Sequence, residues 1–445
     1  MPTKIWTPFF LTANFTRSGN VLTFTVTPSD EDTYVCYYSH VDAASSTGHS
    51  HALETRTGGW SGGSTWQMGQ QPDGQELLVM KGVSVLPLWV AYSTAGNGTN
   101  LTVRKANIHP TTGAFIEWVT SGVVCNASGS AAETPRVLKC MSNTGLGPVF
   151  LATQNGGWVR VYRIDGNTIT STWNMSSVET SEPTSLYVEA DGTIWLTITS
   201  NLDEGAADGV WRSTDGGANF TRRGDGHDDP YSQDFAPGFY GTAACVIVDE
   251  VRRRIWCSHG RLITIGGDGG RFVSYSDDEG VSWTDVTLFG NNFGHGGTSS
   301  LTGWPYRDGD HVSFNIDVQT GGNGQGYISA PATVTYNGGV IAGNNIEEMA
   351  FFDSPAYRVA VYLDGSSAGQ VKISSDSSAT WGNTEDLNGE VRRRGMSIQR
   401  ETQFVALAST ALTNFHISID RGLNFATFAV PSSLRAQLVA WADGF

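Results

Sequence analysis

The stretch "SYSDDEGVSWTDV", residues 274–286, places four residues at fixed intervals: Ser276, Asp278, Gly280 and Trp283. We call the pattern S-x-D-x-G-x-x-[WF] the turn motif. Aspartate and serine side chains accept hydrogen bonds from nearby backbone N–H groups, and glycine supplies a positive φ. The pattern therefore predicts a braced hairpin turn whose aromatic ring folds back between neighbouring sheets. On this interpretation the aspartates serve structure and not catalysis.

The turn motif occurs three more times, each time after an alternating apolar segment and before a second short strand-like run. That arrangement is typical of a β-hairpin. One copy has Ser378 in place of the glycine. The residues of the three further copies are Ser213, Asp215, Gly217 and Phe220; Ser374, Asp376 and Trp381; and Ser418, Asp420, Gly422 and Phe425.

Three hairpins without the motif, at residues 101–118, 159–173 and 326–339, complete a series with a spacing of roughly 45–60 residues. Two further strand-like runs precede each hairpin of the series. Four strands per repeat predict an all-β fold, a β-propeller with four-stranded blades. The series favours seven blades, with six or eight as alternatives. We expect an N-terminal β segment at 1–74 (an extra module or a degenerate blade), the propeller at 75–430, and a closing strand or tail at 431–445.

Composition excludes several classes of protein. A net charge of −16 argues against nucleic acid or an anionic membrane as partner. No apolar run reaches the roughly 18 residues of a membrane span, so no membrane insertion is expected. The N-terminal stretch does not resemble a secretory signal. Five cysteines with irregular spacing indicate neither a disulfide framework nor a zinc site, and Cys245 and Cys257 are expected to be free buried thiols facing each other across a hairpin.

The four motif copies resemble the Asp-box, or bacterial neuraminidase repeat, of a propeller group that includes the sialidases. By pattern alone the resemblance extends over residues 75–430. It implies that the motif turns join the two outer strands of a blade, on the face opposite the ligand site. It implies little about function, because the box occurs in glycosidases, assembly factors, sorting receptors and viral proteins.

A sialidase would need an arginine triad that begins in [FY]-R-I-P, and a tyrosine nucleophile activated by a glutamate. The nearest match, "YRID" at residues 162–165, lacks the proline and places Arg163 in an outer hairpin. The runs Arg252–Arg254 and Arg392–Arg394 are interpreted as solvated charge, on a strand turn and on an inter-blade linker respectively. No tyrosine nucleophile can be identified, which disfavours a true sialidase.

A ligand site is expected on the top face, formed by the loops between blades and those between second and third strands. Two segments, at 224–242 and 289–311, combine aromatic, histidine and acidic residues, and a third, at 257–271, offers His259, Arg261 and Asp268. Aromatic rings stack on the apolar faces of a sugar while polar side chains bind its hydroxyls. The candidate ligand-binding residues are His227, Tyr231, Tyr240, His259, Arg261, His295, Trp304, Tyr306 and Arg307.

Candidates for an acid–base pair are Asp228, Asp229, Asp268 and Glu347, where Glu347 is expected at the beginning of an inner strand. No cofactor or metal is expected, because the nearby His40, His49 and His51 are interpreted as incidental.

The first functional hypothesis is a non-enzymatic recognition propeller, a phage tail fibre or tip protein of a virion. It would bind a surface glycan or protein receptor, and its N-terminal segment would contact other virion proteins. The Gly-, Ser-, Thr- and Asn-rich composition favours this hypothesis. The missing signal peptide also favours a virion, or an extracellular place reached without a secretion signal. The alternatives are a glycoside hydrolase, sialidase-like or polysaccharide-degrading, and a purely structural or assembly propeller.

Overall fold

The computed structural model describes residues 3–9, 14–28, 33–41, 49–57, 63–93, 101–109, 115–125, 134–140, 147–155, 158–176, 181–200, 209–224, 241–249, 253–261, 271–287, 306–308, 311–316, 324–329, 333–337, 345–352, 357–363, 369–375, 382–385, 387, 391–399, 404–409, 413–429 and 440–441. Every regular element in these ranges is a β-strand, which confirms the all-β prediction. None of the described residues forms a helix that could cross a membrane. The chain divides into two compact units, residues 1–86 and 87–445.

The first unit packs two small antiparallel sheets against each other. One has the order β5-β4-β7 with β1 also paired to β7, and the other has the order β2-β3-β6. Tyr34, Cys36 and Tyr38 alternate along β4 and meet Phe15 and Trp66 of the second sheet in a shared core. The strands are β1 (Thr3–Phe9), β2 (Phe15–Ser18), β3 (Val21–Phe24), β4 (Thr33–Val41), β5 (His49–Thr57), β6 (Thr65–Gln67) and the first part of β7 (Pro72–Ser93).

The second unit contains a series of four-stranded antiparallel sheets, each formed by consecutive strands. The first three are β10 (Thr134–Cys140), β11 (Val149–Asn155), β12 (Trp158–Asp165) and β13 (Thr168–Ser176); β14 (Ser181–Val188), β15 (Ile194–Ser200), β16 (Gly209–Ser213) and β17 (Thr221–Arg222); and β18 (Gly241–Asp249), β19 (Arg254–Arg261), β20 (Arg271–Ser276) and β21 (Thr284–Thr287).

Three more sheets follow in the same order. They are β22 (Tyr306–Asp308), β23 (His311–Ile316), β24 (Gly324–Ser329) and β25 (Thr333–Asn337); β26 (Asn345–Phe352), β27 (Tyr357–Leu363), β28 (Gly369–Ser374) and β29 (Gly382–Glu385); and β30 (Val391–Gln399), β31 (Phe404–Ser409), β32 (Asn414–Ser418) and β33 (Ala426–Ala429).

The last part of β7 pairs with β8 (Leu101–Ile108), which pairs with β9 (Phe115–Cys125). The C-terminal strand β34 (Ala440–Trp441) pairs with the same part of β7, Ala440 opposite Ser93 and Trp441 opposite Tyr92. The end of the chain thus adds a strand to a sheet formed some 350 positions earlier. β34 also contacts β10, the first strand of the next sheet.

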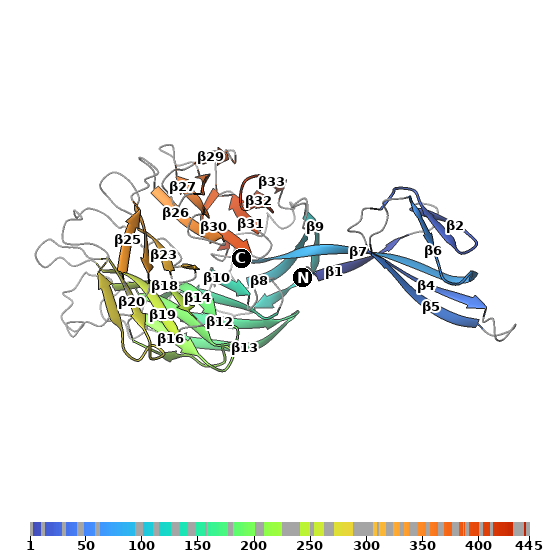
Figure 1. Cartoon of the computed structure of the whole chain (residues 1–445). Coiled ribbons are helices and arrows are strands. Elements are labelled where there is room, and N and C mark those ends of the chain that lie inside the picture. Colours follow the sequence, from blue (N-terminus) through green and yellow to red (C-terminus); the bar gives the residue numbers. More distant parts are fainter. Residues whose placement is uncertain are drawn as a thin grey trace, which may run out of the picture. The chain divides into compact units, whose positions relative to one another are not determined.

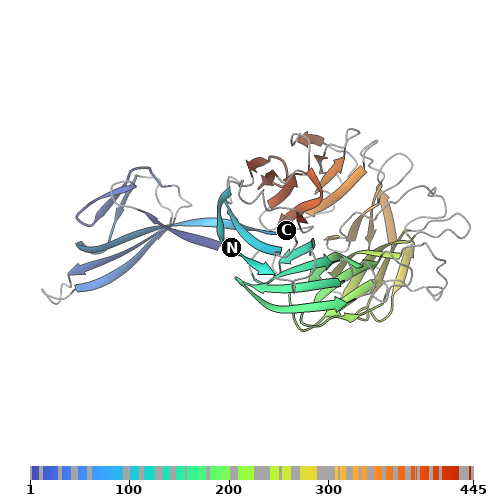
Figure 2. The same ribbon diagram turned by 180° about the vertical axis from the view of Figure 1, so that it is seen from behind.

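The sheets of the second unit succeed one another around a common centre, as in a β-propeller (Figures 1 and 2). First strands of neighbouring sheets contact each other: β10 with β14, β14 with β18, and β26 with β30. Each hairpin predicted from the sequence is a pair of antiparallel strands. The number of blades that close the ring stays a prediction. The domain boundary predicted at residue 74 also stays a prediction, and it falls inside β7.

Both faces of a sheet are covered by its neighbours, which explains why buried residues on one strand belong to different cores. In β12, Tyr162 and Ile164 pack with Leu101 and Val103 of β8. Val159 and Val161 of the same strand belong to a core shared with strands β14 and β15. Burial on both faces requires apolar side chains at almost every position of the middle strands.

Three turn motifs have the predicted geometry. In each, the serine Oγ donates to the aspartate at 2.7–2.8 Å and accepts from the glycine N–H at 2.7–2.9 Å. The aspartate accepts a further backbone hydrogen bond from the residue four positions along the chain. The glycines Gly217, Gly280 and Gly422 have φ of 90°, 81° and 86°. The motif is therefore a braced turn between the third and fourth strands of a sheet. In the fourth copy, Ser374 ends β28, while Asp376 and Trp381 lie outside the described residues.

The motif aromatics fill the space between sheets, as predicted. The ring centroids of Phe220 and of Trp173 in the preceding sheet lie 4.8 Å apart. Trp283 shares a core with Trp195 and donates its Nε1–H to the carbonyl of Arg223 at 2.9 Å. Each turn thus fastens its own hairpin and contributes to the packing against the sheet before it.

Cys36, Cys125 and Cys257 are buried thiols that form no disulfide. Burial, with a smaller effect of Glu54, raises the pKa of the Cys36 thiol to about 12, so this side chain acts as a small apolar residue. Cys245 pairs with Ser258, and Cys257 pairs with Val246, so Cys245 and Cys257 are offset by one position.

Candidate functional site on the top face

The strand register distinguishes two faces of the second unit. Ile194, at the beginning of β15, pairs with Ser213, where a turn motif begins. Ile255 of β19 pairs in the same way with Ser276. The turn between first and second strands therefore lies beside the turn motif, on what we call the bottom face. The first strands begin, and the second and third strands are joined, on the opposite top face.

Five described first strands have a β-bulge just after they begin, on the top face. In β10, β14, β18 and β26 the pairing with the second strand skips one residue. In β30, Val391 pairs with Ser409 and the next pair is Met396 with Leu407, so four residues lie opposite Ala408. Bulges redirect side chains and occur next to functional sites. The bulged residues are Arg136, Thr184, Ala244, Glu347 and the segment Arg392–Gly395.

Arg136 connects two neighbouring first strands. Its Nε and Nη2 donate to Oε1 of Gln154 at 3.0 and 2.6 Å. Its Nη1 lies 2.9 Å from Oε1 of Glu182 on β14, and both side chains are 32% exposed. A guanidinium group held in this way keeps a defined orientation while part of it still faces solvent.

Thr184 is the bulged residue of the next sheet. Its Oγ1 hydrogen-bonds Oγ1 of Thr197 at 2.9 Å, across to the second strand. Pro135 and Pro183 stand immediately before the bulged residues of β10 and β14. Proline within a strand marks an edge or a bulge, so these prolines were the sequence signal for Arg136, Glu182 and Thr184, which sequence reasoning missed.

Glu347 and Arg392–Arg394, which we call the second arginine run, lie at the bulges of two other sheets. Glu347 is the bulged residue of β26, on a first strand as predicted. Arg392–Arg394 were predicted on an inter-blade linker, and this was wrong because they belong to β30 itself. The four-residue bulge keeps them within the strand, on the top-face side of Met396.

His259 and Arg261 lie at the top-face end of β19 and not in a loop. His259 pairs with Ala243, next to the bulge of β18, and Arg261 pairs with Gly241. Tyr306 and Arg307 were placed in a top-face loop by sequence reasoning, but they form β22, next to the turn before His311. That turn joins first and second strands, so these two residues lie towards the bottom face.

The structure thus places His259, Arg261 and Glu347 at one face with Arg136 and the second arginine run. The other candidates lie outside the described residues: His227, Asp228, Asp229, Tyr231, Tyr240, Asp268, His295 and Trp304.

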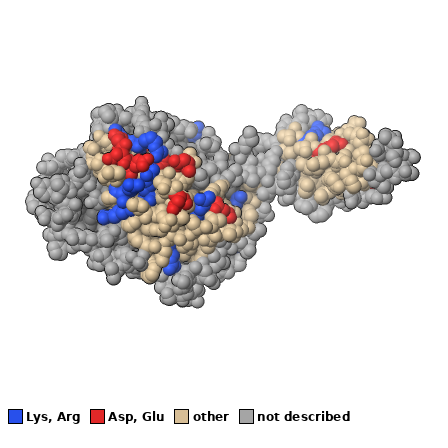
Figure 3. Space-filling model, turned by 90° about the horizontal axis from the view of Figure 1, so that it is seen from below, with Lys and Arg blue, Asp and Glu red and all other residues tan. Residues whose placement is uncertain are grey.

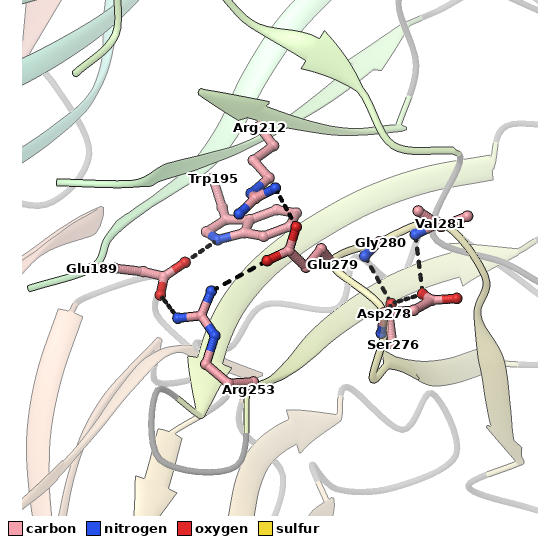
Figure 4. Close-up of polar contacts among 9 residues, drawn as sticks. All are labelled: Glu189, Trp195, Arg212, Arg253, Ser276, Asp278, Glu279, Gly280 and Val281. Atoms are coloured by element: carbon pink, nitrogen blue, oxygen red, sulfur yellow. Dashed lines mark hydrogen bonds and ion pairs between the residues drawn. The ribbon is translucent and has the colours of Figure 1, made fainter. Parts of the chain in front are cut away.

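The bottom face has a network of charged groups of its own (Figure 4). Glu189, whose side chain is 1% exposed, accepts from Trp195 Nε1 at 2.7 Å and from Arg253 Nη1 at 2.6 Å. Arg212 donates to Glu279 at 2.7 Å and stacks over the Trp195 ring at 5.3 Å. Glu279 also lies 3.8 Å from Arg253. These contacts join the turns of two neighbouring sheets.

Arg254 completes the network, with its guanidinium 4.0 Å from the Tyr275 ring centre and two hydrogen bonds of 2.6 Å to Asp277. The interpretation of Arg252–Arg254 as solvated charge was therefore wrong for Arg253 and Arg254. Figure 3 shows acidic and basic side chains adjacent to one another on the surface seen from below. Because the opposite charges are interspersed and paired, the network is structural.

Among the residues that the structure describes, no group of three or more His, Cys, Asp or Glu could hold a metal ion. His51 stacks on Tyr37 at 5.4 Å, and His40 contacts the carbonyl of Val41 at 3.3 Å.

No family model matches the chain, and no curated protein sequence matches it. Solved structures with a similar fold include YCF48 from Cyanidioschyzon merolae, 14% identical with a TM-score of 0.42, covering 69% of this chain and 87% of that one. A GH74 enzyme from Niastella koreensis is 14% identical with a TM-score of 0.38, covering 77% and 63%. A chain of a nidogen/laminin complex is 12% identical with a TM-score of 0.38, covering 66% and 98%. These proteins are β-propellers, and no functional argument rests on similarity at this level.

Proposed function

We propose that this chain is a non-enzymatic recognition propeller that binds a surface glycan or a protein receptor at its top face. The observation that carries the proposal is the recurrent bulge at the beginning of five first strands. Bulges redirect side chains and are over-represented next to active sites, so their recurrence at one level supports a ligand site there.

In this proposal the four turn motifs are Asp-boxes in the family sense, and they stabilise the fold on the bottom face, away from the ligand. The proposed setting is a virion, where the N-terminal unit attaches the propeller to other virion proteins. The composition supports that setting, and the separate core of residues 1–86 supports a distinct attachment unit.

The second candidate is a glycoside hydrolase, and Glu182 and Glu347 favour keeping it. Both stand at the beginning of first strands on the same face. Hydrolysis with a carboxylate pair needs the two groups within about 10 Å of each other. Glu182 is already engaged with Arg136 at 2.9 Å, which favours recognition over acid–base chemistry.

A glycan-array screen with released sugar assayed on every hit tests the proposal. We expect binding without released sugar, weakened by Arg136→Gln and unchanged by Val281→Ser, an exposed position in a bottom-face turn. Released sugar that disappears with Glu347→Gln would establish the hydrolase. If neither a glycan array nor a panel of host-surface proteins gives binding, the recognition proposal fails and the structural role is favoured.

A further inference from the structure

Strand β5 forms one edge of the larger sheet of the first unit, and β4 is its one neighbour among the strands that the structure describes (Figure 1). All nine residues of β5 pair with β4 without a register shift. Native proteins blunt an edge strand with proline, lysine or other charges, with a bulge, or by keeping it short, because its outward N–H and C=O groups can pair with another chain. The sequence of β5, HSHALETRT, contains no proline, glycine or lysine.

Other edge strands in the described part of the chain are interrupted, covered or short. β1 contains Pro8, and β9 pairs with β8 across two register shifts. β13 has one register shift, and its Ile169, Trp173 and Met175 pack on buried cores. The other fourth strands are two to five residues long. The long edge with regular pairing is therefore that of β5.

An exposed apolar row runs across the same sheet and ends at this edge. Tyr37 of β4 pairs directly with Leu53 of β5 on one side and with Leu78 of β7 on the other. The three side chains lie on the face opposite that of Cys36, which belongs to the core. Leu53 is 68% exposed and Leu78 is 43% exposed. The row is therefore more exposed at the edge strand than at β7.

Both charged residues of β5 take part in contacts within the first unit. The carboxylate of Glu54 accepts hydrogen bonds from the Tyr38 hydroxyl and, at 2.7 Å, from the N–H of Gly69. Arg56 donates from Nη1 to the carbonyl of Thr65 at 2.8 Å. These contacts connect the inner face of β5 to β6 and the residues just after it. The two charges therefore hold the edge strand in place.

A second copy of β5 fits this edge in antiparallel orientation. Leu53 is the middle residue of the strand, so a two-fold axis at Leu53 gives all nine residues a partner. Glu54 then faces Ala52 of the second copy. Arg56 faces Ser50 of the second copy, so no like charges lie directly opposite each other. A shift of the axis by one residue would place the two Glu54 carboxylates face to face.

We propose that β5 pairs with β5 of a second copy of this chain, forming a two-fold dimer with Leu53 on the axis. Backbone hydrogen bonds then join two sheets into one, as in other cases of strand addition. The row of Leu78, Tyr37 and Leu53 continues from one copy into the other, which buries apolar surface. The inference goes beyond the proposed function and does not depend on the ligand. A dimer carries two propellers, and simultaneous binding by two sites raises avidity.

Sedimentation velocity of the full chain over a series of concentrations measures the association. We expect a monomer–dimer equilibrium. Leu53→Asp should raise the dimer dissociation constant at least about tenfold, because two carboxylates then face each other and the apolar contact is lost. Val26→Asp is the matched control, since Val26 is an apolar residue of the same unit, 78% exposed and outside β5. This control should dimerise as the wild type does.

Cysteine cross-linking tests the register independently of the aspartate variant. Residues directly opposite in an antiparallel pair have Cα atoms about 4.5–5.5 Å apart, which a disulfide can bridge. Leu53→Cys should therefore form a disulfide-linked dimer under mild oxidation. Thr55→Cys should not, because its two copies would lie four residues apart along the strands, on the order of 13 Å. The wild type and Val26→Cys give the background of cross-linking.

Three results would overturn the inference. The first is a chain that stays monomeric throughout the concentration series. The second is a dimer that Leu53→Asp leaves intact, or an assembly larger than two copies, since a two-fold strand pair closes with two. The third is cross-linking by Thr55→Cys and not by Leu53→Cys. Each of these leaves the proposed recognition function standing, because the glycan array measures that function separately.

Discussion

The chain contains the sequence VRRR twice, at residues 251–254 and 391–394, and the two copies have different structures. In the first, Arg253 and Arg254 follow the turn between β18 and β19 and engage three carboxylates on the bottom face. In the second, the arginines form the long bulge of β30 on the top face. Identical residues therefore pair with carboxylates between sheets in one place and form a long strand bulge in the other.

The difference shows that the role of a charged run is set by what the fold brings to it. Glu189 lies 64 residues before Arg253 in the chain, and Glu279 comes from the turn motif of the same sheet as Arg253. Arg253 itself has a φ of 59°, a left-handed conformation that a non-glycine residue adopts at a cost of about 1 kcal/mol. The ion pair with Glu189 offsets that cost.

The largest effect is expected from Arg253→Ala. This change leaves the carboxylate of Glu189, which is 1% exposed, with the hydrogen bond from Trp195 Nε1 but without its ion pair. Removing one partner of a buried ion pair is strongly destabilising, and here the loss should be about 2–3 kcal/mol because Arg253 is 45% exposed and water can replace part of it. Urea unfolding measures the loss.

Two further variants sharpen this test. E189Q/R253A removes the buried charge as well, and should recover part of the lost stability. Arg222→Gln, at an exposed position of β17, should change stability by less than about 0.5 kcal/mol. A loss in R253A no larger than that in R222Q would mean that the first run is solvated charge after all.

At low pH the folded structure around the first arginine run should be less stable. Hydrogen bonds from the hydroxyl and backbone N–H of Ser282, and then from Ser276, lower the pKa of Asp278 from 3.8 to about 2. A hydrogen bond from the backbone of Thr193, assisted by Arg253 and Arg212, also lowers the pKa of Asp191. Because the folded-state pKa values are depressed, this stabilisation is complete above pH 3.8 and is lost as the pH falls to about 2.

The measurement is the urea midpoint of the wild type and of Asp278→Asn across that pH range. The wild type should lose stability more steeply than the variant, since the variant has no proton to take up at this position. Parallel curves for the two proteins would contradict the role assigned to the Asp278 hydrogen bonds.

The same comparison explains what sequence can predict. The turn motif was predicted correctly because its contacts are local: Ser276, Asp278 and Gly280 hydrogen-bond within four residues of one another. The top-face bulges depend on register between strands, and the partners of Arg253 depend on packing between sheets. A run of three arginines carries neither kind of information, so both copies were interpreted alike. Pro135 and Pro183 were the local signs of two bulges.

A smaller effect is expected from Arg254→Ala. Arg254 stacks on Tyr275 at 4.0 Å and pairs with Asp277, which is 54% exposed. An ion pair with an exposed acidic partner contributes little to stability, whereas a cation–π contact contributes on the order of 1 kcal/mol. The variant should therefore lose about 1 kcal/mol of unfolding free energy, measured by urea unfolding. Arg254→Lys should keep part of the contact. A loss as large as that of R253A would show that exposure of the partner does not distinguish the two arginines.

The smallest effect on folding is expected from R392Q/R393Q/R394Q, although it removes three charges. Surface substitutions usually change the free energy of unfolding by less than about 0.5 kcal/mol, and we expect the same of glutamine in the bulge. A loss comparable to that of R253A would show that the second run, like the first, is held by carboxylates of the chain.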